Sequence, residues 1–309
     1  MPRAALYNET GAPDVLYVDD VPTPPVDADR VRIAVRAAGI NPVDSKLRSG
    51  FIPVPAEVPF PRGVGGDYAG VVLEAGPTAT YTDGTTVEIG DEVLGWTMGE
   101  AIREELVVPA SNLARKPAAL AFTVAGGLVT PALTAQAAID RNGISADDTV
   151  LVSAAAGGVG LLYSQLALAI GATVIGTASE ANHDRLRALG IIPVAYGEGR
   201  AERVREASPT PITAVQDNHG RETVEAAVAL GVPRERICTI VDYGTVDEFG
   251  IISPGRYERR PDTLETLAER VADGELTLPI QELFPLDRVA DAFRVSEERH
   301  LLGKLIVTP

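Results

Sequence analysis

The sequence has a single cysteine, Cys238, and only three histidines among its 309 residues. One cysteine excludes an internal disulfide, and the sequence has no clustered Cys/His spacing of the kind that holds zinc. We therefore expect no bound metal. Cys238 lies in an apolar segment, with no charged neighbour evident that would lower the pKa of its thiol. It is expected to be a small buried core residue and not a nucleophile.

Positive charge and long apolar runs are also scarce. The chain carries 27 Lys and Arg against 43 Asp and Glu, a net charge of −16, which argues against a nucleic-acid partner. The N-terminal residues lack the apolar core of a signal peptide, and no apolar run approaches the ~20 residues that span a bilayer. We expect a cytoplasmic protein with no membrane segment.

The order of strand and helix patterns predicts two domains. Residues 1 to about 110 show short alternating segments between turn clusters, which favour a small barrel. From residue 122 onward, helical and strand patterns alternate, which predicts a doubly wound parallel sheet with a last strand at 249–253. The final strand, 304–307, is expected to return to the barrel. The predicted boundaries are 1–121, 122–275 and 276–309.

The stretch from 149 to 163 is the centre of the second domain. An apolar β-branched run, 149–152, passes into Ala155-Ala-Gly-Gly-Val-Gly160, and a helical pattern follows. Such a turn directs the free N–H groups of a helix N-terminus at one point, where a pyrophosphate binds. Gly157 would let the backbone approach the ligand, and Gly160 would let the helix pack on the strand.

The next strand predicts the choice of cofactor. An NAD site places an acid at the end of this strand, but here it ends in Thr177-Ala178-Ser179. The helix that follows supplies His183 and Arg185, and a hydroxyl with basic groups suits a 2′-phosphate. The sequence therefore favours NADP(H) over NAD(H), although Glu180 is close and Arg185 is equally suited to a solvated surface position.

Several separate segments resemble one family. In this order along the chain they are Ala38-Gly-Ile-Asn-Pro-Val-Asp44, Gly65-Gly-Asp-Tyr-Ala-Gly-Val-Val72, Gly90-Asp-Glu-Val-Leu-Gly95, Leu133-Thr-Ala135, Ala155-Ala-Gly-Gly-Val-Gly160 and Gly303-Lys304. The chain resembles the medium-chain dehydrogenases/reductases, in the zinc-independent branch of quinone oxidoreductase-like enzymes. The resemblance implies a Rossmann domain inserted into a GroES-like barrel, a homodimer, and a site between the domains.

The same resemblance points to the catalytic residues. The zinc branch has Cys and His-Glu where this chain has Asn41 and Asp67, so donors to an enolate oxygen are expected in place of a metal. Lys46, with Ser45 and Tyr68 nearby, either holds the nicotinamide ribose or stabilises the enolate. An ion pair with Asp44 or a solvated position remains open for Lys46. For Asn41 a turn-forming role remains open, and for Asp67 a purely structural one.

The resemblance also carries over the cofactor contacts. Thr130 and Thr134 are expected near the nicotinamide ribose, Ser179 and His183 at the 2′-phosphate, and Tyr196 beside the adenosine phosphate. The expected cofactor-binding residues are completed by Ala156, Gly157, Gly158, Val159 and Gly160 at the pyrophosphate, by Arg185, and by Asn218 and Ile240 after two later strands.

The function implied is an NADPH-dependent reductase that delivers hydride to an electron-poor C=C bond or a quinone. The expected partner is a small enone, enoyl or quinone substrate. Two alternatives remain. One is a pathway-specific enoyl reductase that acts on a biosynthetic intermediate. The other is a non-catalytic NADPH-binding protein, because a fold does not determine a function.

Overall fold

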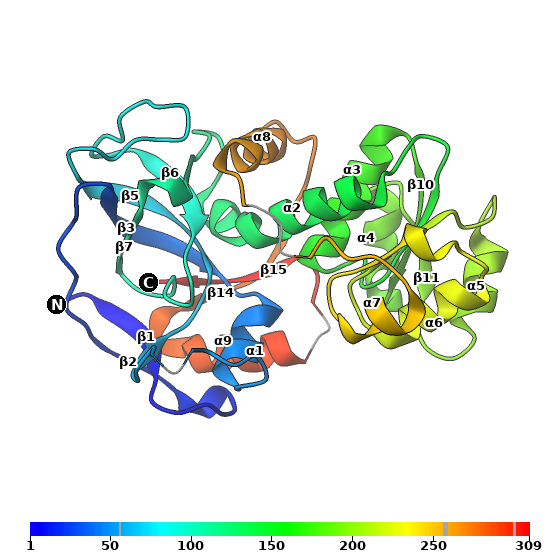
Figure 1. Cartoon of the computed structure of the whole chain (residues 1–309), viewed down its shortest axis with the longest axis horizontal. Coiled ribbons are helices and arrows are strands. Elements are labelled where there is room, and N and C mark those ends of the chain that lie inside the picture. The colour runs from blue at the N-terminus through cyan, green and yellow to red at the C-terminus, as the bar shows by residue number, and fades with distance from the viewer. Residues whose placement is uncertain (56, 256–258, 299–300) are drawn as a thin grey trace. The chain divides into compact units, whose positions relative to one another are not determined.

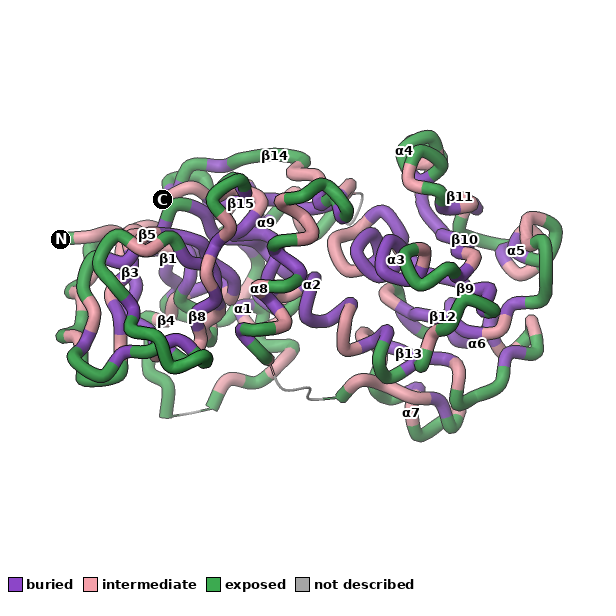
Figure 2. Tube along the Cα trace, turned by 90° about the horizontal axis from the view of Figure 1, so that it is seen from above, coloured by how far each residue is buried: buried purple, intermediate pink, exposed green. Residues whose placement is uncertain are grey.

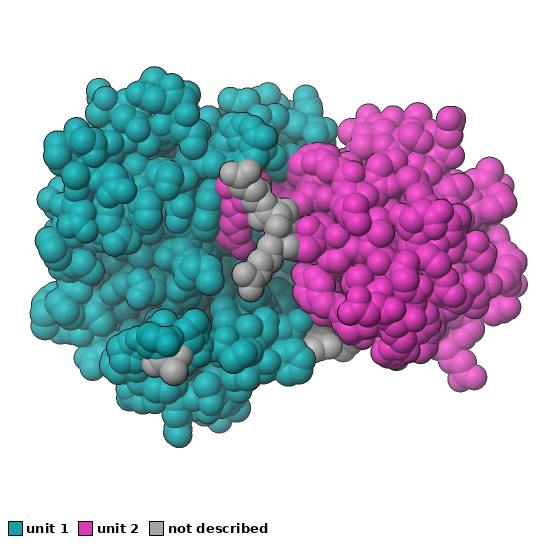
Figure 3. All heavy atoms as spheres, viewed as in Figure 1, with its two compact units in different colours: residues 1–130, 260–309 teal, residues 131–259 magenta. Residues whose placement is uncertain are grey.

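The computed structural model describes residues 1–55, 57–255, 259–298 and 301–309, and the chain forms two compact units (Figure 3). Unit 1 contains Met1–Thr130 and Arg260–Pro309, and unit 2 contains Pro131–Arg259. The chain therefore leaves unit 1 once and later re-enters it. The boundaries at 121/122 and 275/276 stay a prediction from the sequence.

Unit 1 is built on two sheets (Figure 1). Val31, Ile33 and Val35 alternate along β3 and are almost completely buried, as expected for a strand with one face on a core. C-terminal β15 pairs antiparallel with β3, so the chain end lies in the same sheet as this N-terminal strand. The larger sheet has the strand order β14 (Ile280–Pro285), β15 (Lys304–Thr308), β3 (Arg30–Gly39), β5 (Asp67–Ala75), β6 (Glu92–Trp96) and β8 (Leu113–Arg115). Strand β7 (Glu105–Pro109) also pairs with β3. The smaller sheet has the strand order β2 (Leu16–Asp20), β1 (Arg3–Tyr7) and β4 (Arg62–Gly63).

The helices of unit 1 anchor the connection after β3. Helix α1 (Pro42–Arg48) starts with proline at its first position, and the Asp44 carboxylate accepts the Asn41 N–H at 2.8 Å. Arg48, only 1% exposed, donates to the Gly11 carbonyl and pairs with Glu297. Because Glu297 ends helix α9, Arg48 links α1 to the C-terminal segment. The other helices of unit 1 are α8 (Pro261–Ala272), α9 (Val289–Glu297) and the short 3₁₀ turns Pro13–Val15, Ala110–Asn112 and Leu286–Arg288.

Unit 2 contains the predicted parallel sheet, with strand order β11-β10-β9-β12-β13 (Figure 1). The order reverses beside β9, and ligands of doubly wound sheets bind at such a reversal. The core strands are buried along their length (Figure 2). The strands are β9 (Thr149–Val152), β10 (Thr173–Ala178), β11 (Ile192–Ala195), β12 (Ala214–Asp217) and β13 (Ile237–Thr239). The helices are α3 (Gly158–Ile170), α4 (His183–Ala188), α5 (Arg200–Ala207), α6 (Arg221–Ala229) and α7 (Gly244–Phe249). Short 3₁₀ turns lie at Glu180–Asn182 and Arg234–Arg236.

Two features of unit 2 compare directly with the sequence expectations. Cys238 on β13 is fully buried, and burial raises the pKa of its thiol to about 12, which confirms a core residue. The strand expected at 249–253 is wrong. Helix α7 runs to Phe249, and Gly250 ends it at φ 67°. Only Ile252 then bridges to Cys238 before Pro254, which has no N–H to continue a ladder.

Helix α2 (Phe122–Asn142) begins in unit 1 and ends in unit 2. By length and composition it is apolar enough to cross a membrane, contrary to the expectation that no segment is, but 61% of its most apolar window is buried in the protein. A core helix passes the same test, so α2 is weak evidence for a membrane span. Pro131 lies inside it and cannot donate to the carbonyl four residues earlier, where the chain passes from one unit to the other.

Candidate functional site

Unit 1 brings two predicted catalytic residues and one predicted cofactor residue together. The Asn41 side-chain amide donates to the Asp67 carboxylate at 2.9 Å, and Thr130 donates to the same carboxylate through its N–H at 2.8 Å and its hydroxyl at 2.6 Å. Lys304 Nζ donates to Asn41 Oδ1 at 2.8 Å and to the Ile40 carbonyl. We call Asn41, Asp67, Thr130 and Lys304 the Asn41 cluster.

Small residues bring the elements of the Asn41 cluster together. A Cβ at Gly39 would lie 2.6 Å from the Gly126 carbonyl oxygen, and one at Gly126 would lie 2.6 Å from the Ala37 carbonyl oxygen. A Cβ at Gly127 would lie 2.8 Å from Ile306 Cδ1 and 3.4 Å from Lys304 Cβ. Helix α2 therefore packs directly on β3 and β15, and this close packing brings Thr130 to Asp67.

Three residues of the Asn41 cluster are buried, and Thr130 is partly exposed. Asn41 is 3%, Lys304 5% and Asp67 0% exposed. Burial lowers the pKa of the Lys304 ammonium, although Asp67 and Asp44 oppose the shift. The Asp67 carboxylate accepts hydrogen bonds from Asn41 and Thr130. Asp67 therefore holds Asn41 and Thr130 in place.

The remaining predicted donors differ in their surroundings. Lys46 forms no ion pair with Asp44 among the described residues, and its Nζ lies 5.9 Å from the centre of the Phe51 ring. Ser45 Oγ is buried without a partner within the described ranges. Tyr68 is fully buried, and its hydroxyl packs against Gly95, where a Cβ would lie 2.7 Å from it. Lys46 and Ser45 remain candidates.

In unit 2 the turn between β9 and α3 has the geometry of an anion cradle. No side chain caps the N-terminus of α3, whose first turn contains no acid, so the first N–H groups of the helix are not used by a side-chain acceptor. A Cβ at Gly160 would lie 2.3 Å from the Ala154 carbonyl oxygen, which confirms that glycine is needed for the helix to pack on the turn. Ala154 has φ 46°, a strained conformation for alanine.

Asp217 holds three strand ends together beside this turn. Its carboxylate accepts the Ser153 hydroxyl at 3.0 Å, the Thr239 hydroxyl at 2.7 Å, and the N–H groups of His219 and Gly220 at 2.9 Å each. Predicted cofactor residue Asn218 donates its N–H to Ser153 Oγ at 2.8 Å. The second predicted residue, Ile240, donates its N–H to the Asp217 carbonyl at 3.1 Å. Asp217 thus positions both residues.

The residues expected at a 2′-phosphate follow β10. Ser179 Oγ accepts the Asn182 amide at 3.2 Å, and His183 Nε2 lies 3.3 Å from the Ala178 carbonyl oxygen. Arg185 is exposed and has no partner in the described part of the chain. On the next loop Tyr196 is 46% exposed.

The other predicted cofactor residues lie in unit 2. Ala156 is 4% and Thr134 8% exposed, whereas Gly157, Gly158 and Val159 are partly exposed at the start of α3. These residues belong to the same turn, except for Thr134 on α2.

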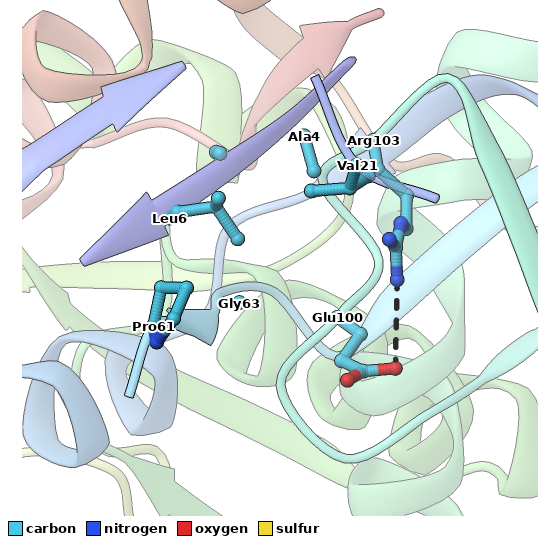
Figure 4. Close-up of a pocket in the computed structure, with 8 residues that line it drawn as sticks. Ala4, Leu6, Val21, Pro61, Gly63, Glu100 and Arg103 are labelled. Atoms are coloured by element: carbon cyan, nitrogen blue, oxygen red, sulfur yellow. Dashed lines mark ion pairs between the residues drawn. The ribbon is translucent and has the colours of Figure 1, made fainter. Parts of the chain in front are cut away.

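A cavity of about 140 Å³ in unit 1 is unconnected with these groups (Figure 4). Arg103 and Glu100 face each other across it, 3.6 Å apart. None of the predicted catalytic residues lines it, and its two charges compensate each other. It is lined by Ala4, Ala5, Leu6, Val21, Pro61, Gly63, Glu100 and Arg103.

Sequence reasoning missed two positioning residues. Lys304 was noted only as part of a motif, yet it is a lone lysine at the start of an otherwise apolar strand. Asp217 ends the apolar strand β12 in the same way. A charged residue inside a buried strand needs partners, and that is the signal that identifies both.

Two family models match the chain. The model described as "Alcohol dehydrogenase GroES-like domain" covers residues 27–118, and the one described as "Zinc-binding dehydrogenase" covers residues 199–307. With the parallel sheet of unit 2, these matches confirm the predicted combination of a Rossmann sheet with a GroES-like domain.

Individual proteins are similar over nearly the whole chain. The NADPH-dependent alkenal/one oxidoreductase, chloroplastic, of Arabidopsis thaliana is 30% identical, over 99% of this chain and 79% of that protein. The structure of the quinone oxidoreductase from Coxiella burnetii is 30% identical with a TM-score of 0.89, over 100% of this chain and 99% of that chain. The spectinabilin polyketide synthase system protein NorB of Streptomyces orinoci is 38% identical over 92% of this chain, which spans only 13% of that protein.

Proposed function

Because this chain belongs to the medium-chain dehydrogenase/reductase superfamily, in its quinone oxidoreductase-like branch, we propose that it is an NADPH-dependent reductase. Its substrate is a small molecule with an electron-poor C=C bond conjugated to a carbonyl, or a quinone. The names of the Arabidopsis and Coxiella proteins support these two substrate classes.

The Asn41 cluster is the observation that supports this chemistry most directly. Reduction of an enone places negative charge on the carbonyl oxygen, and a buried donor aimed at that oxygen stabilises the charge. Asn41 Nδ2 gives one hydrogen to Asp67, and its second hydrogen has no acceptor among the described residues. We propose that this second N–H donates to the substrate oxygen.

The chemistry of the donor set supports a reaction without zinc. Asn41 and Asp67 occupy the positions at which the zinc branch carries metal ligands, and they bond to each other with a lysine ammonium beside them. A buried ammonium next to this pair opposes a second cation. Asn41 Nδ2 would then polarise the substrate carbonyl in place of a metal ion.

The turn between β9 and α3 fits a dinucleotide. Its glycines leave room for a pyrophosphate, and the helix N-terminus offers N–H groups without side-chain acceptors. Ser179, His183 and Arg185 follow β10, where an NAD site has an acid, so we propose NADPH over NADH. When bound, NADPH supplies the hydride. Asn218 and Ile240 lie at the same sheet edge and would contact it.

The chain's residues have the following roles in the step. The hydride adds to the β-carbon of the enone, and the electron pair of the C=C bond moves toward the carbonyl oxygen. Asn41 Nδ2 donates to that oxygen, and Lys46 or Ser45 of α1 donates to it as well. A proton from solvent then completes the saturated ketone. The hydride would thus supply both electrons and the hydrogen at the β-carbon, and the solvent proton would supply the hydrogen at the α-carbon.

A pathway-specific enoyl reductase is the second candidate. The 38% identity to one segment of a polyketide synthase protein supports it. Such an enzyme would reduce enoyl thioesters faster than small enones.

Turnover on a defined panel tests the proposal. Purified protein with NADPH is expected to reduce at least one of a small enone, a quinone and an enoyl thioester, with loss of absorbance at 340 nm. Asn41→Ala is expected to lower kcat by about 10²-fold, the usual effect of removing one such donor. Tight NADPH binding with no turnover of any acceptor would instead support a non-catalytic role.

A further inference from the structure

Lys304 is buried at one end of the Asn41 cluster, although it lies more than 260 residues from Asn41 in the sequence. It opens β15, and the glycine before it has φ 74° with no space for a side chain, since a Cβ there would lie 2.0 Å from the Pro279 carbonyl oxygen. The register of β15 is thereby fixed. As a result, the ammonium reaches the end of β3, where the Ile40 carbonyl and Asn41 Oδ1 accept it.

The hydrogen bonds determine which way the Asn41 amide points. An ammonium has only donors, so it faces the amide oxygen, and a carboxylate has only acceptors, so it faces the amide nitrogen. With Lys304 at Oδ1 and Asp67 at Nδ2, a flipped amide would place donor against donor and acceptor against acceptor. Asn41 is therefore held in one orientation, with one Nδ2–H donated to Asp67 and the second not used by an acceptor among the described residues.

The position of Lys304 favours a functional explanation over a stabilising one. Burial lowers the pKa of its ammonium even though Asp67 and Asp44 raise it. A lowered pKa means that the folded state disfavours the charged form relative to the unfolded chain. A buried ammonium of this kind does not add to stability by its charge alone, and apolar side chains often replace buried ion pairs without loss.

We infer that Lys304 is a positioning residue that orients and polarises the Asn41 amide, so that the free Nδ2–H becomes a stronger donor to the substrate oxygen. This inference rests on the proposed function. The ammonium at Oδ1 withdraws electron density from the amide, and hydrogen bonds along such a chain strengthen one another. Asp67 and Thr130 fix the opposite end of the chain.

Lys304→Met, which keeps a similar stem and removes the charge, tests the inference. With an enone that the wild type reduces, kcat is expected to fall about tenfold, part of the 10²–10³-fold that loss of a whole donor costs. KM for the enone and the dissociation constant for NADPH are expected to stay within about twofold. The substitution affects the hydride-transfer step, in which charge develops on the substrate oxygen, and not the binding of either molecule in the ground state. If the wild type reduces no acceptor, that result contradicts the proposed function. A result against the role of Lys304 requires a wild type that is active.

Lys116→Met is the matched control. Lys116 is also a buried lysine of unit 1, 7% exposed, which donates to the Pro117 and Leu120 carbonyls and pairs with Glu92. It shares no partner with Asn41. Its loss is expected to lower the melting temperature and leave kcat unchanged. Equal losses of kcat in both variants would overturn the inference.

The pH profile provides a test that does not depend on a folded methionine variant. Asp67 of β5 and Asp44 of α1 are the charged groups that face Lys304. Since burial lowers the pKa of Lys304, the charged form is lost as pH rises, at a midpoint below the ordinary value of about 10.4. Wild-type kcat is expected to fall there, and Lys304→Arg, which stays charged, is expected to abolish the fall. A flat wild-type profile, or the same fall in Lys304→Arg, would overturn the inference.

Discussion

At the scale of single residues, the choice of cofactor depends on the side chain that follows β10. Ser179 has a hydroxyl where a carboxylate would bind a ribose, and the unpartnered Arg185 lies on the next helix. Ser179→Asp is expected to weaken NADPH binding by about 10-fold or more and to leave NADH binding unchanged or improved, because a carboxylate repels a 2′-phosphate. Titration of nicotinamide fluorescence measures both affinities.

Ser208→Asp is the control for this change. Ser208 follows α5 in the same unit, and the substitution adds the same charge. It is expected to shift neither affinity by more than about twofold, because Ser208 is not one of the residues proposed to contact the cofactor. An equal loss of NADPH affinity in both variants would show that total charge and not Ser179 is responsible.

At the scale of elements, two glycines of the β9–α3 turn have separable roles. A Cβ at Gly160 would meet the Ala154 carbonyl at 2.3 Å, whereas one at Gly157 would meet the same atom at 3.4 Å. Gly160→Ala is therefore expected to destabilise unit 2 by about 1–3 kcal/mol through overpacking. Gly157→Ala is expected to keep the melting temperature of the free protein but to weaken NADPH binding, because its Cβ lies at the helix N-terminus.

Thermal unfolding with and without NADPH separates the two effects. A ligand that binds only the folded state raises the melting temperature. Gly157→Ala is expected to lose that rise, and Gly160→Ala to start from a lower melting temperature. If the two variants behaved alike, the turn would not be the pyrophosphate site.

The helices and strands of unit 2 also show which elements can be predicted from local sequence patterns. Strand 149–152 and helix 158–170 were predictable, because an apolar run and a helical period each follow from local residues. The strand expected at 249–253 was not, because Gly250 ends a helix whose start depends on the Thr245 hydroxyl bonding to the Asp242 carbonyl at 2.6 Å. The hydrogen-bond partners of Lys304 could not be predicted from the sequence either, because they depend on the register of β15 against β3.

At the scale of the whole molecule, acid stability depends on carboxylates that tie segments together. Asp148 accepts the Thr213 hydroxyl and the Arg236 guanidinium, each at 2.6 Å, and the Ser145 N–H at 2.7 Å. Burial alone would raise the pKa of its carboxyl, but these hydrogen bonds outweigh it and hold the pKa below the usual range. Its contribution to stability is therefore present above about pH 4 and lost as the pH falls further.

Asp148→Asn tests this dependence. The variant is expected to melt lower than the wild type at pH 7, and the difference is expected to shrink as the pH falls below about 4. Melting curves followed by circular dichroism from pH 3 to pH 7 measure it. Asp184→Asn, at an exposed residue paired only with Arg187, is the control and is expected to change little. A difference that stays constant with pH would contradict the role given to Asp148.

The assembly of the whole molecule remains a prediction from the resemblance, which implies a homodimer. The net charge of −16 and the two compact units are properties of the single chain, and they do not select a partner. Sedimentation analysis would decide the oligomeric state without bearing on the chemistry.

Transfer of deuterium is the most direct test of the proposed reaction. Protein incubated with NADPH deuterated at C4 of the nicotinamide and with an enone is expected to yield a saturated ketone that carries deuterium at its β-carbon. Mass spectrometry and NMR locate the label. Reduction with no deuterium at that carbon, or no reduction of any enone, enoyl thioester or quinone despite NADPH binding, would contradict hydride transfer by this protein.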